Sequence, residues 1–318
     1  MPLRLTTFRQ LRLYPILIGH PLLNSVTIPN SVKSIGNNVF QYCTGLTDIG
    51  IPNSVTSIGW SVFNDCSNLT EINVAADNQE FSSKNGVLFD KEKATILRYP
   101  CGKSGKYSIP NTVMFIADEA FETCTGLTSV IIPGGVTNIG GYAFYQCTGL
   151  TSITSRAITP PICGSECFKG VDKSIPVNVY AEALDAYNDA PAWNEFTNIQ
   201  AICTRATGTC GADGDNLQWV LSCDSVLTIR GTGAMKDYGY SGGPWGSSNL
   251  KYIKSVVIEQ GVTSVGKFAF YRCQAMTSGQ VPCDAMRELI DYSLCVSQLQ
   301  ETAKNSHLPN NILFYLEV

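Results

Sequence analysis

The sequence predicts an α/β fold in which a strand-and-helix unit repeats and stacks into a solenoid. Two observations support this: a period of 23 residues, and an apolar pattern that changes from strand to helix spacing within each period. The units "LNSVTIPNSVKSIGNNVFQYCTG" (23–45) and "LTDIGIPNSVTSIGWSVFNDCSN" (46–68) are adjacent, and "LTSVIIPGGVTNIGGYAFYQCTG" (127–149) returns later. The shared template is L-x-x-I-x-I-P-x-x-V-x-x-I-G-x-x-x-F-x-x-C-x-x.

The first element of each unit is a short strand. In the second quoted unit, Ile49 and Ile51 have strand spacing and face inward, so Asp48 and Gly50 face outward. Pro52 ends the strand, because proline cannot donate a hydrogen bond to a strand ladder.

A second extended piece and a short helix complete the unit. Residues 55–58 include β-branched residues, which favour an extended backbone, and Gly59 permits a bend. Residues 60–66 carry apolar side chains at helical spacing and predict a short helix. Because a later unit has Ala117 at the Gly59 position, we expect Gly59→Ala to cost less than about 1 kcal/mol.

One such unit is too small to bury its apolar face alone. Stacked copies share these faces and join their strands into one parallel sheet, which gives a solenoid. The variable residues between the fixed apolar positions then form its surface.

These units resemble the BspA-like leucine-rich repeat family, whose units read "LTSVTIP…SVTSIG…AF…CTG". The resemblance covers about Leu22 to Met276. It implies a curved solenoid with a parallel sheet on the concave side and short helices on the convex side. It also implies surface-exposed, secreted proteins of anaerobic bacteria and some protozoa, linked to adhesion and host contact.

Changes in the repeat pattern predict the organisation of the chain. A short helix is expected at 181–188, and a small antiparallel β module, similar to one that opens new arrays in this family, precedes a second, truncated array. Both ends of the chain are expected to pack poorly, and the pattern leaves open whether the chain is a fragment or a frame-shifted product. The expected segments are an off-pattern N-terminal segment (1–20), a repeat array (21–203) with an insertion-bearing repeat at 75–106 and a terminal cap at about 155–203, the antiparallel module (204–252), the start of a second array (253–276) and an off-pattern C-terminal tail (277–318).

Composition argues against nucleic acid as a partner and against a membrane span. The 318-residue chain has a formal net charge of −4 and a sequence pI near 5.3, so it lacks the basic character of a polyanion binder. The segment 11–19 follows several arginines but is short, contains Pro15 and has no small-residue cleavage site. An extracellular or cell-surface location is therefore implied by the resemblance alone.

The cysteines at the template position after phenylalanine are expected to be buried thiols, because a small apolar group fits there. These are Cys43, Cys66, Cys124, Cys147 and Cys273. A disulfide among Cys203, Cys210 and Cys223 stays open. Cys163 and Cys167 have no second pair of cysteines to complete a zinc site.

No catalytic, cofactor or metal site is expected. The two histidines, His20 and His307, lie outside the template, so catalysis that needs histidine has no place in the repeats. The "GKS" at 102–104 has Leu97 where a phosphate-binding loop needs its first glycine. Asp48 and Glu71 lie on a flat face and do not suggest a glycosidase pair.

The outward strand positions are the candidate binding surface, which we call the concave strip. Its expected partner is a protein or glycan on a host cell or extracellular matrix. A structural spacer of a larger surface protein is the alternative, and a carbohydrate-active enzyme is a distant third; the ligand and the oligomeric state are not predicted. The concave strip consists of Ser25, Thr27, Asp48, Gly50, Glu71, Asn73, Lys106, Ser108, Ser129, Ile131, Ser152 and Thr154.

Overall fold

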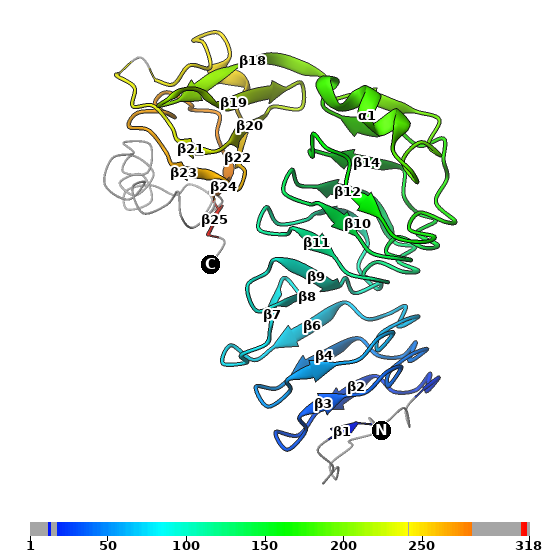
Figure 1. Ribbon diagram of the computed structural model, residues 1–318. Helices are drawn as coiled ribbons and strands as arrows, with labels where there is room; N and C mark the ends of the chain where they lie inside the picture. Colours follow the sequence, from blue (N-terminus) through cyan, green and yellow to red (C-terminus); the bar gives the residue numbers. More distant parts are fainter. Residues whose placement is uncertain (1–11, 14–17, 241, 282–312, 317–318) are drawn as a thin grey trace. The chain divides into compact units, whose positions relative to one another are not determined.

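The computed structural model (Figure 1) describes residues 12–13, 18–240, 242–281 and 313–316. The chain divides into two compact units. The first contains residues up to 109 together with 113–201, and the second contains 110–112 together with the residues from 202 onward. Mostly parallel strands joined by turns confirm a leucine-rich repeat solenoid.

The main sheet of the first unit takes one strand from each coil. Its strands pair in parallel at a step of 23 residues, so Asp48 lies beside Glu71 and Ile49 beside Ile72. The apolar partner of each pair is buried and the polar partner faces out, as alternation predicts. One part of this sheet contains β2 (Ser25–Thr27), β4 (Asp48–Ile51) and β6 (Glu71–Val74), and the other contains β10 (Gly105–Ser108), β12 (Leu127–Ile132), β14 (Ser152–Ser155), β16 (Val177–Val179) and β17 (Ile199–Ala201).

A second sheet of short strands follows the same coils and is also in two parts. The third coil interrupts both sheets, because it contains an antiparallel hairpin. One part contains β1 (Arg12–Leu13), β3 (Ser34–Ile35) and β5 (Ser57–Ile58). The other contains β7 (Phe81–Lys84), β8 (Val87–Asp90), β9 (Thr95–Arg98), β11 (Phe115–Ile116), β13 (Asn138–Ile139) and β15 (Ile162–Cys163).

The predicted short helices of the repeats are instead hydrogen-bonded turns. Ser61 and Asp65 have φ angles of 51° and 56°, which interrupt a right-handed helix. The corner amides bond to the neighbouring coil; the Phe40 amide, for example, donates to the Val62 carbonyl at 3.1 Å. The helix expected at 181–188 is present as a 3₁₀ turn, η1 (Ala181–Ala183), followed by α1 (Leu184–Asp189).

The core of the first unit is a ladder of stacked aromatic rings. The ring centroids of Phe40 and Phe63 are 5.8 Å apart, and those of Phe121 and Phe144 are 4.7 Å apart. Trp193 packs against the last ring of the ladder, Phe168, at 5.0 Å. Burial of these rings from coil to coil supplies the apolar contacts that a single unit lacks.

The expectation that Gly59→Ala is nearly neutral is wrong. A Cβ atom at Gly59 would lie 2.6 Å from the Asn37 amide nitrogen and 2.8 Å from the Gly36 carbonyl carbon. The glycine is needed because two coil backbones approach closely there, rather than because of a positive φ angle. Ala117 is tolerated because it borders the open groove described below.

One template cysteine is not a thiol, contrary to expectation. Cys124 forms a disulfide with Cys101, which lies 23 residues earlier and is its neighbour in the preceding coil. The other four template cysteines are buried thiols, and burial raises the pKa of Cys66 to about 12. Among Cys203, Cys210 and Cys223, for which a disulfide was left open, Cys203 and Cys223 form one.

The second unit begins with antiparallel strands and continues with parallel ones. Ser255 in β22 lies beside Ser278 in β24, so the 23-residue step continues past 276, where the repeats were expected to stop. Most of the off-pattern ends, namely 1–11, 14–17, 282–312 and 317–318, lies outside the described residues. The elements are β18 (Thr204–Gly211), β19 (Gly214–Ser222), β20 (Val226–Gly231), β21 (Gly233–Ala234), η2 (Leu250–Tyr252), β22 (Ser255–Ile258), β23 (Val262–Ser264), β24 (Ser278–Val281) and β25 (Leu313–Leu316).

Candidate functional site

The residues of the concave strip form aligned rows on the main sheet. Ser25 pairs with Asp48, and Gly50 pairs with Asn73 in the next coil. The same alignment holds on β10, β12 and β14, where Ser129 pairs with Ser152. The rows belong to two separate parts of the sheet, because β6 and β10 are not paired.

Exposure varies along the concave strip. On β2, β4, β6 and β10 its members are exposed, whereas on β12 and β14 they are half-buried. The half-buried members are Ser129, Ile131, Ser152 and Thr154. The first four coils therefore offer the most accessible side chains.

Sequence analysis missed two polar residues that continue these rows into the cap. Asn178 on β16 pairs with Thr154, and Gln200 on β17 pairs with Asn178. The Gln200 Nε2 atom donates to Asn178 Oδ1 at 2.9 Å. Strand-like alternation in "VNV" and "IQA" was the available signal, but it lies where the 23-residue template has already decayed.

The chemistry of these rows is that of hydrogen bonding and charge. Asn73 Nδ2 donates to Glu71 Oε2 at 3.0 Å, and Ser152 Oγ donates to Ser129 Oγ at 3.0 Å. No group of three or more His, Cys, Asp or Glu residues that could hold a metal ion occurs in the described part of the chain. The rows can therefore supply donors, acceptors and charge to a ligand.

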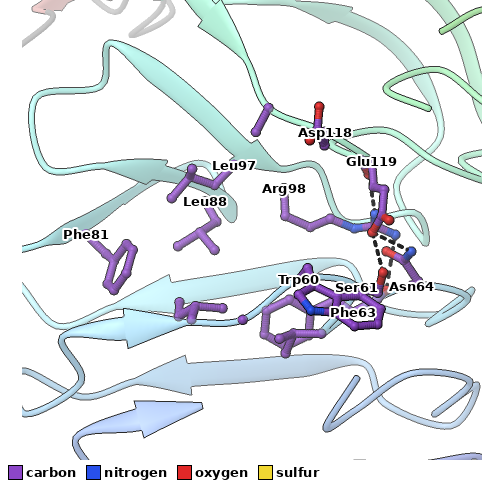
Figure 2. Close-up of a pocket in the computed structure, with 14 residues that line it drawn as sticks. Trp60, Ser61, Phe63, Asn64, Phe81, Leu88, Leu97, Arg98, Asp118 and Glu119 are labelled. Carbon is purple, nitrogen blue, oxygen red and sulfur yellow. Dashed lines mark hydrogen bonds between the residues drawn. The ribbon is translucent and has the colours of Figure 1, made fainter. Parts of the chain in front are cut away.

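A groove of about 660 Å³ is the second candidate site, and it lies where the hairpin interrupts the stack (Figure 2). One wall is the corner that follows β5, and the other is the segment after β11. Its volume is within the range of small-molecule sites in proteins. It is lined by residues 58–64, Phe81, Leu88, Leu97, Arg98 and residues 117–119.

The groove exists because the third coil has a short corner. Ile96 pairs with Ile116, so these isoleucines occupy the same position in successive coils. From Ile116 to Cys124 the chain advances eight residues, but from Ile96 to Cys101 it advances only five. Three corner residues are thus absent from the third coil, and the walls of the groove face the space they would fill.

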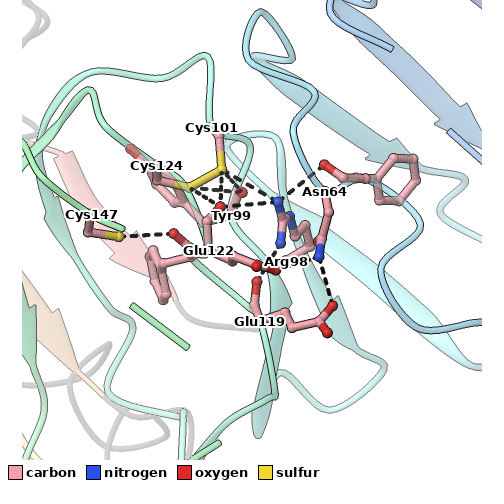
Figure 3. Close-up of a disulfide and its surroundings, with 10 residues drawn as sticks. Asn64, Arg98, Tyr99, Cys101, Glu119, Glu122, Cys124 and Cys147 are labelled. Atoms are coloured by element: carbon pink, nitrogen blue, oxygen red, sulfur yellow. Dashed lines mark hydrogen bonds between the residues drawn. A yellow bond between two sulfur atoms is a disulfide. The ribbon is translucent and has the colours of Figure 1, made fainter. Parts of the chain in front are cut away.

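Arg98 lies in this short corner and was missed by sequence analysis (Figure 3). It precedes Cys101 by three residues, as Phe63 precedes Cys66, but the ring that stacks on Phe121 in the ladder, at 5.1 Å, is that of Tyr99. The guanidinium group donates to the carbonyls of Phe63 at 3.2 Å and Glu122 at 3.4 Å, and also to that of Glu119. Burial lowers the pKa of Arg98, while the Glu122 carboxylate acts to raise it.

Two carboxylates cross the gap beside Arg98. Glu119 Oε2 accepts hydrogen bonds from Ser61 Oγ and from Asn64 Nδ2, and Asn64 also donates to Glu122. Burial, and then repulsion by Glu119, raises the pKa of Glu122 to about 7, against the opposing effect of Arg98. Side chains thus replace part of the missing coil-to-coil contact at this end of the groove.

Within the part of the chain that the structure describes, no helix has the length and apolar character needed to cross a bilayer.

Comparisons with known proteins find similar solved structures and one matching family. A search of curated proteins finds no match. A leucine-rich cell surface protein of Faecalibacterium prausnitzii has 22% identity and a TM-score of 0.39, over 83% of this chain but only 49% of that protein. A leucine-rich repeat protein of Eubacterium ventriosum has 19% identity and a TM-score of 0.40, over 84% of this chain and 75% of the other.

A further solved structure, a leucine-rich repeat protein of Bacteroides ovatus, has 20% identity and a TM-score of 0.35, over 88% of this chain and 72% of the other. The sequence profile described as "BspA type Leucine rich repeat region" matches six copies, over residues 19–89, 98–189 and 247–312. The chain therefore belongs to the BspA-type leucine-rich repeat family.

Proposed function

We propose that this chain is a non-catalytic recognition module that binds a protein or glycan partner through the concave strip. The observation that carries the proposal is the alignment of outward side chains, such as Asp48 beside Glu71 and Gly50 beside Asn73, on parallel strands of each part of the sheet. A preformed surface of this kind gains many weak contacts without paying for ordering of loops on binding.

The proposed partner lies on a host cell or in the extracellular matrix, and the chain acts outside the cell or at its surface. The description of the Faecalibacterium prausnitzii structure as a cell surface protein supports this location. The accessible end of the concave strip, on β4 and β6, carries Asp48, Glu71 and Asn73, so it presents acidic and amide groups to a ligand.

The test replaces these three residues together by lysine and measures binding of the labelled chain to cultured epithelial cells, to immobilised matrix proteins and to a glycan array. Binding should fall by at least about tenfold, because each contact is worth little alone but the patch is worth much. The unfolding temperature should change by only a few degrees, since these side chains are exposed.

A matched control makes the same charge change elsewhere in the first unit, by replacing Glu92, Asp185 and Asn188 with lysine. All three are exposed and lie outside the concave strip. The control should keep full binding. Equal binding by both triple variants would contradict the assignment, and absence of binding by the unmodified chain to every surface would favour a structural spacer.

A further inference from the structure

The corner that follows β5, which forms one wall of the groove, has backbone amides that find no acceptor in the described chain. In other coils these amides donate to the neighbouring coil: Phe121 to the Ala143 carbonyl at 2.8 Å, and Phe144 to the Cys167 carbonyl at 2.9 Å. The equivalent amide of Phe63, and that of Ser61, find no acceptor among the described residues. The equivalent amides of the neighbouring coils are paired, so this row is unusual.

The strand that leads into this corner is open on the same side. Its residues, Ser57 and Ile58, pair only with β3. In the preceding coil the Ile35 carbonyl accepts the Gly59 amide at 2.9 Å, and Ile58 is the equivalent of Ile35 on the open edge. The groove therefore presents an edge strand and then two amides, in the order in which a stacked coil would use them.

The side chains around the groove favour a positively charged ligand. Asp118 and Glu119 are carboxylates, and Arg98 is the one cationic residue among those described along its walls. The guanidinium group of Arg98 is already bonded to three backbone carbonyls. Trp60 is 62% exposed, and an indole face attracts cations.

We propose that this groove binds a segment of a partner protein that follows the path of a missing coil corner and carries a basic side chain. Its backbone adds to the open edge at β5 and supplies carbonyls to the Ser61 and Phe63 amides, which is a form of strand addition. Its basic side chain lies against Trp60 and Asp118. This site is separate from the concave strip and does not depend on the function proposed for it.

Because the coils pack closely, the partner segment that binds the groove also needs a glycine. An added Cβ would lie 2.4 Å from the Asp118 amide nitrogen at Gly140, and 2.6 Å from the Asn37 amide nitrogen at Gly59. Residues 265–270 of this chain, Val-Gly-Lys-Phe-Ala-Phe, combine an apolar residue, that glycine, a lysine and the template phenylalanine. A synthetic hexapeptide of this sequence, blocked at both ends, is therefore a suitable probe.

Trp60 reports binding directly, because the other three tryptophans, Trp193, Trp219 and Trp245, are buried. Titration of the full chain with the probe should give a saturable change in fluorescence, with a dissociation constant below about 1 mM. A peptide with glutamate in place of lysine should bind at least about tenfold more weakly, because it meets carboxylates.

Two variants separate the groove from other surfaces. Ala117→Leu places a larger side chain in the groove and should weaken probe binding by at least about tenfold. Asp118→Asn keeps an acceptor for the Gly141 amide, as Asn37 does for the Trp60 amide, but removes the charge; it should weaken binding about two- to fivefold. Glu92→Gln, on the exposed hairpin turn, is the matched control and should bind normally.

The proposal is overturned if the probe gives no saturable signal, if the glutamate peptide binds equally well, or if both groove variants bind like the unmodified chain. Dimerisation of the chain that Ala117→Leu abolishes would assign the groove to a second copy instead of a partner. The triple lysine variant of the concave strip should still bind the probe, so the two proposals can fail separately.

Discussion

Arg98 stands three residues before its cysteine, as Phe63 and Phe121 do in their own coils, and its guanidinium group links the coils on either side through carbonyls of residues 63, 119 and 122. Arg98→Met removes the donors and leaves buried carbonyls unpaired. We expect a loss of about 2–5 kcal/mol in the free energy of unfolding. Equilibrium denaturation of the reduced and oxidised chains measures it.

Arg98→Lys is the comparison for that experiment. A single ammonium group cannot replace a planar guanidinium group that donates to several carbonyls. Lysine should therefore recover less than half of the lost free energy of unfolding. If Arg98→Met cost less than about 1 kcal/mol, Arg98 would be only a space-filling residue.

The raised pKa of Glu122 predicts that the stability of the first unit depends on pH. Its pKa is raised to about 7 from a reference value of 4.5, so the folded chain holds this proton more tightly than the unfolded chain. The contribution of Glu122 is therefore present at low pH and is lost as the pH rises from about 4.5 to 7. Glu122→Gln keeps an acceptor for Asn64 and should flatten the stability profile across this window.

Glu92→Gln, at an exposed position, is the control and should leave the profile unchanged. Denaturation midpoints at several pH values between 4 and 8 measure both variants. A Glu122→Gln profile that still falls like that of the unmodified chain would mean that another group titrates in this window.

At the scale of the elements, the contact between coils decides which residues the corner tolerates. Gly59→Ala should cost about 1–3 kcal/mol, because its Cβ would overlap the backbone at Gly36 and Asn37. Ala117→Gly, at the same template position beside the groove, should cost less than about 1 kcal/mol. Equal costs for the two substitutions in thermal unfolding would contradict this explanation.

The sequence was sufficient to predict the strands and the core, because alternation at Ile49 and Ile51 and the period of the phenylalanines both follow from packing. The helical spacing of residues 60–66 was misleading, since residues 61 and 65 adopt positive φ angles, which interrupt a right-handed helix. The disulfide of Cys124 was not predictable from the template, because Cys43 and Cys66 share the same spacing and remain thiols.

The groove was hidden from sequence analysis for a different reason. Residues 75–106 were interpreted as an insertion, but the register of β9 shows that the third coil also lacks three corner residues. That register depends on how the hairpin pairs, so spacing alone does not reveal it. Arg98 could have been noticed from its distance to Cys101, once Cys101 was placed in phase with Cys124.

At the scale of the whole molecule, the repeats form a scaffold with two kinds of surface. The regular coils present aligned polar rows, and the irregular third coil breaks the ladder and leaves an open edge beside acidic groups and Trp60. In both proposals, variation between coils, rather than the template itself, is what distinguishes ligands.

The central claim is that coil-to-coil hydrogen bonding is interrupted at residues 61 and 63, and amide hydrogen exchange measured by NMR tests it most directly. The Ser61 and Phe63 amides should exchange at least about tenfold faster than those of Phe40 and Phe121, which have acceptors in the next coil. Saturation with the Val-Gly-Lys-Phe-Ala-Phe peptide should slow both. Protection of Ser61 and Phe63 equal to that of Phe40 and Phe121 in the chain alone would contradict the account.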